Sequence, residues 1–215
     1  MVKKKIGAEF WVSNEYLADK YFYLNPKILL PYPAYVKEDE KLSEARETPV
    51  VFYHATASHI EEFYWLKKLL LELTQENLLF ELVVDKKIGK LYKGIKNVYM
   101  VDPMPWKEYL TFSSLKYRHI GLAPLLDNSF NRARSWVKFY NIVRSGAVGV
   151  YSEYFPIAKL IKEFNAGLVL PMDVRLWKDG IISLIDEEKR KELFKGSLEL
   201  INYLRKETLK SYDNF

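Results

Sequence analysis

The sequence of 215 residues contains no cysteine. This absence excludes disulfide bonds, thiolate zinc sites and a cysteine nucleophile. Histidine is also scarce, with three residues in the whole chain. His54 and His59 are too few to hold a metal ion without nearby acids, so we expect no metal site.

Long apolar runs are absent as well. No stretch approaches the roughly 18–20 consecutive apolar residues that a transmembrane helix needs. The basic start, Met1 to Lys5, is not followed by the apolar segment of a secretory signal. We therefore expect no transmembrane segment and a cytoplasmic protein, associated with a membrane only through partners.

The chain has little excess charge of either sign. Its 33 basic and 28 acidic residues leave a net charge of +5. This excess suits an anionic ligand but is ordinary for a globular domain, and the basic residues match no nucleic-acid-binding motif. We therefore expect no nucleic-acid partner. Aromatic residues are frequent, at 15%, which fits either an aromatic-rich core or an exposed partner surface.

From Pro49 onward, short apolar runs alternate with helical patterns. Uniformly apolar strands that alternate with helices predict an α/β fold, a Rossmann-like open parallel sheet with helices on both faces. The predicted strands are residues 49–53, 78–84, 97–101, 120–125, 147–151 and 166–170. The predicted helices are residues 59–73, 106–115, 135–143, 156–164, 175–184 and 187–209.

The first 48 residues have a different pattern. Residues 10–13 and 27–30 predict short strands, residues 15–21 predict a helix, and the charged residues 37–48 predict a linker. This segment is too short to close a sheet of its own. We expect residues 1–48 to be the remnant of a preceding domain plus a crossover linker, and residues 49–215 to form the Rossmann-like domain.

A basic segment follows the predicted strand at residues 120–125. It contains Arg132, Arg134 and Lys138, with Ser135 at the predicted start of a helix. Ligands of open parallel sheets bind at the carboxyl ends of the strands, and a helix N-terminus attracts phosphate. The segment therefore predicts a diphosphate site. Two different interpretations stay open: the cations belong to a solvated helix, and Ser135 is only a helix cap.

Five segments, in this order, resemble the C-terminal half of GT-B glycosyltransferases of the group 1 family. They are Trp11-Val-Ser-Asn-Glu-Tyr-Leu17, Ile28-Leu-Leu-Pro-Tyr-Pro33, Tyr53-His-Ala-Thr-Ala-Ser-His59 with Glu62, Val101-Asp-Pro-Met-Pro-Trp-Lys-Glu-Tyr109, and Ile120-Gly-Leu-Ala-Pro-Leu125 continuing to Lys138. Each is weak alone, but their order and spacing cover nearly the whole chain.

The resemblance implies a donor domain that binds a nucleoside-diphosphate sugar for glycosyl transfer, as in polysaccharide biosynthesis, without a metal or other cofactor. It also implies that the acceptor-binding N-terminal half lies outside this chain, so that the isolated half is inactive. The expected partners are the nucleotide sugar and either an acceptor-domain protein or a second copy. The alternative is a non-catalytic nucleotide-sugar-binding or assembly subunit.

The resemblance also implies the residues of the nucleotide-sugar site. Arg134 and Lys138 would neutralise the diphosphate, His59 would contact the sugar, and the backbone at Met104 and Pro105 would cradle the base. The complete predicted set is Thr56, His59, Met104, Pro105, Asn131, Arg134, Ser135, Lys138 and Asn141.

Three positions depart from the family pattern. Ala55 replaces a glycine, and Arg134 replaces a lysine, which exchanges a point charge for a planar fork. Asn141 stands where the family has a glutamate that holds the ribose hydroxyls. It would still accept one hydrogen bond from ribose, without a charge.

Two of the implied contacts also have a purely structural interpretation. Thr56 or Ser58 would cap the next helix instead of facing the ligand, since hydroxyl side chains are favoured at that position. The proline-rich turn would place Trp106 in the core instead of holding a base. The sequence leaves both interpretations open.

Overall fold

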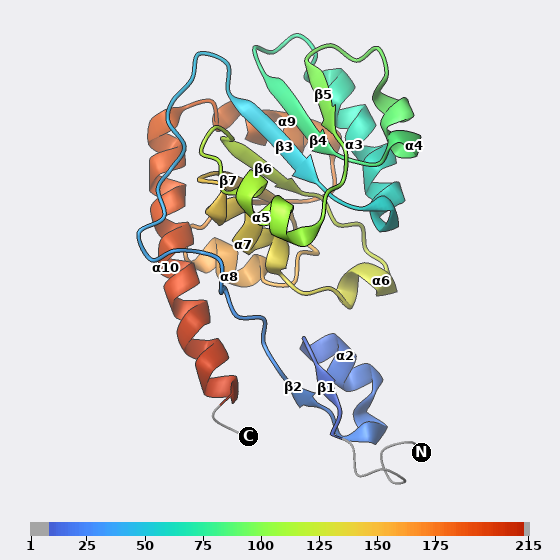
Figure 1. The fold of residues 1–215 in the computed structure, drawn as a ribbon, viewed down its shortest axis with the longest axis vertical. Coiled ribbons are helices and arrows are strands. Elements are labelled where there is room, and N and C mark those ends of the chain that lie inside the picture. Colours follow the sequence, from blue (N-terminus) through green and yellow to red (C-terminus); the bar gives the residue numbers. More distant parts are fainter. Residues whose placement is uncertain (1–8, 213–215) are drawn as a thin grey trace.

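The computed structural model describes residues 9–212. The basic tip from Met1 to Lys5 lies outside these residues. A six-stranded parallel sheet forms the centre of the fold, with the strand order β5-β4-β3-β6-β7-β8 (Figure 1). Its strands are β3 (Val50–His54), β4 (Leu79–Val83), β5 (Val98–Val101), β6 (Ile120–Ala123), β7 (Val148–Ser152) and β8 (Leu168–Leu170). The predicted Rossmann-like α/β fold is confirmed.

Helices cover both faces of this sheet. In Figure 1, α5 and α7 lie in front of the strands, and α3 and α9 lie behind them. The helices are α3 (Ile60–Glu72), α4 (Lys86–Gly89), α5 (Trp106–Ser113), α6 (Ser129–Arg132), α7 (Val137–Arg144), α8 (Ala158–Glu163), α9 (Val174–Ser183) and α10 (Glu187–Tyr212). The double cover explains the uniformly apolar runs, because the residues of β6 and β7 are buried on both faces.

The chain order of the strands creates a switch point. The chain enters the sheet at β3, extends it outward through β4 and β5, and then returns to add β6 on the other side of β3. The loops after β3 and β6 therefore leave in opposite directions and open a crevice at their carboxyl ends. This crevice is where a ligand site is expected from topology alone.

The helix predicted at residues 135–143 begins later in the structure. Asn128 caps the short helix α6, because its Oδ1 accepts a hydrogen bond from the Asn131 amide at 2.8 Å. The chain then leaves helical geometry and α7 begins at Val137, with Trp136 at the cap position. Ser135 therefore does not cap α7, and its side chain stands in a non-helical turn. The sequence pattern did not predict the one-turn helix α4.

The N-terminal segment forms a small unit of its own. Strands β1 (Trp11–Val12) and β2 (Lys27–Ile28) pair in parallel, with α2 (Glu15–Lys20) between them. Asn14 joins this unit to the main domain, since its amide nitrogen donates to the carbonyls of Arg132 and Arg134 at 3.3 and 3.0 Å. An extended connection then leads to β3 (Figure 1). The unit thus touches the basic turn that the sequence singled out.

The C-terminal helix α10 buries its apolar side against its own domain. Leu193, Phe194, Leu200, Ile201 and Leu204 are all buried, and α10 contacts α7 and α8. The helix approaches α8 closely at Gly196, where an added Cβ atom would lie 2.1 Å from the carbonyl oxygen of Phe164. This side of the helix is therefore part of the core and is not left for a partner.

Candidate functional site

A cavity of about 480 Å³ opens at the carboxyl ends of β3 and β6, at the switch point. Its walls come from the loop after β3, from the β5–α5 loop with α5, and from the turn before α7 with α7 itself. Seven of the predicted site residues line it, and they are Thr56, His59, Met104, Arg134, Ser135, Lys138 and Asn141. The fold thus brings together segments that are more than 80 residues apart.

Lys138 projects from the first turn of α7 toward the end of β3. Its Nζ donates to the His54 carbonyl at 3.1 Å and lies 4.2 Å from the centre of the Tyr53 ring. Burial, followed by the neighbouring charge of Arg134, lowers the pKa of Lys138 to about 7. An anion in the cavity would reverse part of this cost, because it would favour the charged ammonium.

Arg134 approaches the cavity from the turn between α6 and α7. Its Nη2 donates to Ser58 Oγ at 3.1 Å, and its guanidinium lies 4.3 Å from the centre of the Phe130 ring. Its buried Nε has no hydrogen-bond partner among residues 9–212. A buried donor without an acceptor is costly, so this Nε is suited to an acceptor atom of a ligand.

The loop after β3 lacks the expected side-chain cap. Thr56 precedes a short 3-10 helix, Ala57–His59, without capping it by a side-chain hydrogen bond. Its Oγ1 instead lies 2.9 Å from Ser58 Oγ. Helix α3 itself begins at Ile60 with His59 at its cap position and no side-chain cap. The interpretation that Thr56 or Ser58 caps this helix is therefore wrong, and their hydroxyl pair stands beside Arg134.

His59 and Glu62 form a buried pair at one side of the cavity, with 3.6 Å between Nδ1 and Oε2. Burial lowers the pKa of His59. Burial would raise the pKa of Glu62, but the neighbouring His59 and the hydrogen bond from Asn131 outweigh it and bring this pKa to about 2. Glu62 is therefore ionised at neutral pH, and it holds His59 in place without lining the cavity itself.

Two predicted site residues do not line the cavity. Asn131 is buried, and its amide nitrogen donates to Glu62 Oε1 at 2.5 Å and to the Leu126 carbonyl at 2.9 Å. Pro105 occupies the cap position of α5. Arg132, a weaker candidate of the basic segment, pairs instead with Asp127 through contacts of 2.7 and 2.9 Å.

Asn141 lies one turn after Lys138 on α7 and lines the cavity. Its Oδ1 accepts a hydrogen bond from Arg144 Nη2 at 2.9 Å. The acceptor that we expected to face a ribose is thus already engaged by a protein donor. Arg144 itself is buried, and it also donates to Ser113 Oγ at 2.8 Å.

Trp106 and Tyr109 form an aromatic wall on α5. Their rings are stacked, with 5.7 Å between centres and 28° between planes, and both residues line the cavity. Trp106 is 49% exposed, so the interpretation that the proline-rich turn places it in the core is wrong. The tryptophans that are buried instead are Trp136 and Trp177, and Trp177 packs edge-on against Trp65 at 5.0 Å.

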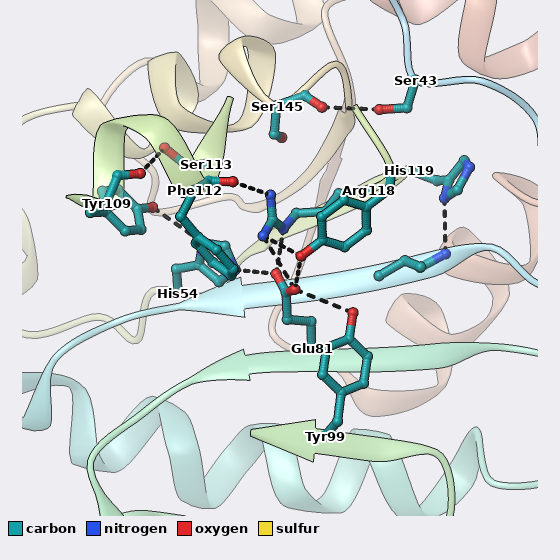
Figure 2. A network of polar contacts seen from close by, with 12 residues as sticks. Ser43, His54, Glu81, Tyr99, Tyr109, Phe112, Ser113, Arg118, His119 and Ser145 are labelled. Carbon is teal, nitrogen blue, oxygen red and sulfur yellow. Dashed lines mark hydrogen bonds and ion pairs between the residues drawn. The ribbon is translucent and has the colours of Figure 1, made fainter. Parts of the chain in front are cut away.

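A buried network of polar side chains is centred on Glu81, and the sequence did not reveal it (Figure 2). It adjoins the cavity through His54 and Tyr109, which line it. The carboxylate of Glu81 accepts hydrogen bonds from His54 at 2.7 Å, from Tyr99 at 3.2 Å, and from Tyr117 and Arg118. Burial would raise the pKa of Glu81, but the hydrogen bonds from His54 and Arg118 outweigh it and bring this pKa to about 2. The network therefore holds a permanent buried ion pair.

This network fixes the imidazole of His54 at the cavity wall. Burial lowers the pKa of His54 to about 4, so the ring is neutral at pH 7. Its Nε2 then carries the proton that Glu81 accepts, and its Nδ1 accepts from the Tyr109 hydroxyl at 3.2 Å. The ring position and the aromatic wall are thus coupled.

Several lining residues were missed from the sequence: His54, Val83, Tyr109, Leu125, Val137 and Phe155. His54 and Tyr109 stand inside two of the segments that carry the family resemblance, but the resemblance assigned neither residue a function. The apolar residues gave no signal, since a lining leucine or valine has the same pattern as a core residue.

Two further structural findings concern metal binding and membrane-spanning helices. Among residues 9–212, no group of three or more histidine, aspartate or glutamate side chains is arranged to hold a metal ion. Within the same residues, no helix combines the length and the apolar character required to cross a bilayer.

No family model and no curated protein sequence matches this chain. Solved structures do match. The C-terminal domain of a glycosyl transferase group 1 family protein, LpcC, from Francisella tularensis aligns with a TM-score of 0.57 and 10% identity, over 78% of this chain and 97% of that domain.

Two longer structures match nearly the whole chain. TarM from S. aureus, solved with UDP, aligns with a TM-score of 0.68 and 13% identity over 96% of this chain. A glycosyltransferase from Rickettsia africae aligns with a TM-score of 0.67 and 8% identity over 99% of this chain. This chain spans 43% and 65% of their respective lengths. It therefore has the fold of the C-terminal half of a GT-B glycosyltransferase, and at these identities the similarity concerns the fold.

Proposed function

We propose that the cavity binds the nucleoside diphosphate of an activated sugar and that the chain acts as the donor domain of a glycosyltransferase. One observation carries the proposal. The cations of Arg134 and Lys138 converge on a cavity at the switch point of a Rossmann-like sheet, beside the start of α7. The fold similarity to glycosyltransferases, one of them solved with UDP, supports it.

The chemistry of sugar transfer suits these groups. Negative charge grows on the diphosphate as the bond to the sugar breaks, and preorganised cations stabilise that charge best in a site shielded from water. Lys138 and Arg134 would supply this stabilisation. The stacked Trp106 and Tyr109 would offer a flat apolar wall to the nucleoside, and the Met104 backbone lies next to it.

The rest of the reaction would depend on a second half. No carboxylate of residues 9–212 lines the cavity, so these residues offer no ionised acid as a general base. We propose that the acceptor and any such base belong to an acceptor-binding half that closes over this cavity. In this view residues 1–48 are the last part of that half and its crossover. The cytoplasmic location stays a prediction.

The second candidate is a subunit that binds a nucleotide sugar without transferring it. Two observations favour this candidate. Asn141 stands where the family has a glutamate, and its oxygen already accepts from Arg144. In addition, no acid of residues 9–212 lines the cavity. The two candidates share the ligand and differ in the reaction. Incubation of the chain with its partner half, a nucleotide sugar and acceptor would separate them by release of free nucleoside diphosphate.

Isothermal titration with UDP, GDP and ADP tests the shared ligand. We expect at least one of them to bind, and Lys138→Met to weaken it by at least tenfold, because a charged hydrogen bond contributes about 1.5–3 kcal/mol. Lys159→Met is the matched control, since Lys159 is exposed on α8 and lies outside the cavity. A folded protein that binds none of the three nucleotides would contradict the proposal.

A further inference from the structure

Arg144 is a buried cation without an acidic partner. Its side chain lies at the last turn of α7, and the residue is 3% exposed. Glu40, the carboxylate whose charge acts on Arg144, pairs with Lys116 instead. Its Nη2 donates to Asn141 Oδ1 at 2.9 Å and to Ser113 Oγ at 2.8 Å. The guanidinium therefore links α7 to α5 through Ser113 and contacts Asn141, which lines the cavity.

The hydrogen bonds of this link have only one possible direction. A guanidinium has five N–H donors and no acceptor, so the Asn141 atom that faces it is the oxygen. The reverse orientation of the amide would oppose two donors. On the other side, the Ser113 hydroxyl donates to the Tyr109 carbonyl at 2.6 Å, so its oxygen is free to accept from Arg144. Both bonds made by Arg144 Nη2 thus end on an acceptor.

The fixed direction decides what Asn141 offers to a ligand. Its oxygen is held by Arg144, while its amide nitrogen has no hydrogen-bond partner among residues 9–212 and is not enclosed in the protein. Asn141 lines the cavity three residues after Lys138, about 4.5 Å further along the helix axis. The cavity thus meets a donor at a position beyond the two cations.

We propose that Arg144 orients Asn141 as a hydrogen-bond donor to the nucleoside part of the bound nucleotide, so that this subsite selects an acceptor oxygen of the ribose or base. The inference rests on the proposed function and reverses the polarity that the sequence suggested for position 141. The diphosphate is left to Lys138 and Arg134. Asn141 is thereby a specificity-determining residue, and Arg144 is its positioning residue.

Two probes separate the nucleoside from the phosphates. The first is the tightest binder among UDP, GDP and ADP, and the second is inorganic pyrophosphate, which lacks a nucleoside. Asn141→Ala removes the donor, and we expect the Kd of the nucleotide to rise about fivefold, as for the loss of one neutral hydrogen bond. The Kd of pyrophosphate should stay within twofold. Equal effects on both probes, or none on either, would overturn the proposal.

Asn141→Asp decides the polarity of the subsite. The new carboxylate repels both anionic probes, so pyrophosphate measures the effect of charge alone. Loss of the donor then adds a further effect on the nucleotide. We expect the ratio of the nucleotide Kd to the pyrophosphate Kd to rise about fivefold or more over the wild-type ratio. A fall in that ratio would mean that position 141 accepts from the ligand, and the inference would be wrong.

Arg144→Met tests the positioning role. We expect it to weaken nucleotide binding severalfold in the wild-type background and to add nothing further in the Asn141→Ala background, since the orientation no longer matters there. Equal weakening in both backgrounds would mean that Arg144 has a general structural role, and the claim that it positions Asn141 would be wrong. If Arg144→Met fails to fold, the two Asn141 variants still decide the proposal.

The outcomes also separate the inference from the proposed function. A wild-type protein that binds no nucleoside diphosphate overturns both. A wild-type protein that binds one through Lys138, with an unchanged or lowered ratio in Asn141→Asp, overturns only the inference and leaves the donor domain standing.

Discussion

At the scale of single residues, the site combines two cations with burial that opposes their charge. Lys138 is the clearest case, because the wall that shapes the cavity also lowers the pKa of its ammonium to about 7. An isolated lysine titrates near 10.4. Burial thus disfavours the charged form of Lys138, and an anionic ligand would favour it. Such perturbed pKa values are typical of functional sites.

The lowered pKa of Lys138 predicts a pH dependence of nucleotide binding. A bound diphosphate raises the pKa of Lys138, so above pH 7 the free protein must take up a proton on binding. We expect the affinity for UDP, or for whichever diphosphate binds, to fall between pH 7 and pH 9 by up to about tenfold per unit. The ligand itself keeps its charge over this range, since the second phosphate pKa is near 6.

Isothermal titration in buffers of different ionisation enthalpy would measure both the affinity and the proton uptake. Lys138→Met is the control and should bind weakly with a nearly flat profile. A wild-type affinity that stays constant from pH 7 to pH 9 would show that Lys138 does not titrate on binding.

At the scale of the elements, the turn between α6 and α7 is the part that shapes the site. Asn128 caps the one-turn helix α6, and the Asn14 amide holds the carbonyls of Arg132 and Arg134 from the N-terminal unit. A continuous helix from Ser129 would have placed Arg134 on a regular helical face. The break instead lets Arg134 and Ser135 reach the cavity from a turn.

The close contact between α8 and α10 gives a prediction at this scale. Alanine is favoured over glycine in a helix by about 1 kcal/mol, but a Cβ at position 196 would lie 2.1 Å from the Phe164 carbonyl oxygen and 2.4 Å from that of Asn165. Backbone atoms cannot yield as a side chain can. We expect Gly196→Ala to lower the free energy of unfolding by about 2–3 kcal/mol, measured by urea titration.

Lys195→Ala is the matched control for Gly196→Ala. Lys195 is the exposed neighbour on α10, so its replacement should change the stability by less than about 0.5 kcal/mol. If Gly196→Ala proves as stable as the wild type, α10 does not dock as closely as described.

At the scale of the whole molecule, Glu81 ties several strands together. It stands in the middle of β4 and binds His54 from β3, Tyr99 from β5, and Tyr117 and Arg118 just before β6 (Figure 2). One carboxylate thus joins the elements on both sides of the switch point. The network supports the cavity wall and the order of the central strands together.

This network predicts sensitivity to acid. The pKa of Glu81 is about 2 in the folded protein and near 4.5 in the unfolded chain, so its contribution is complete above pH 4.5 and is lost as the pH falls toward 2. At pH 7, Glu81→Gln leaves Arg118 buried without a carboxylate, which should cost about 3–5 kcal/mol. Urea titrations at pH 7, 4 and 3 would measure both effects.

Glu72→Gln is the control for Glu81→Gln, because Glu72 is exposed on α3. It should leave the stability and its pH dependence nearly unchanged. If Glu81→Gln loses as much stability on acidification as the wild type does, the acid sensitivity comes from other groups, such as Glu62, and not from this network.

The sequence by itself determined the order of the elements and the kind of sheet. Apolar runs such as residues 147–151 are local patterns, and a run that is apolar on both faces needs cover on both faces. It also placed Arg134 and Lys138 at the carboxyl edge, because their distance from the end of a strand is set along the chain. These are short-range properties that neighbouring residues fix.

Only the tertiary structure decided which side chain meets which. Arg132 donates to Asp127, and Asn131 is buried and donates to Glu62. The oxygen of Asn141 accepts from Arg144. Glu81 accepts hydrogen bonds from residues as far apart in the sequence as His54 and Arg118. A polar group takes the best partner within about 3 Å in the folded chain, and a local pattern fixes neither the identity nor the direction of a partner that folding brings from tens of residues away.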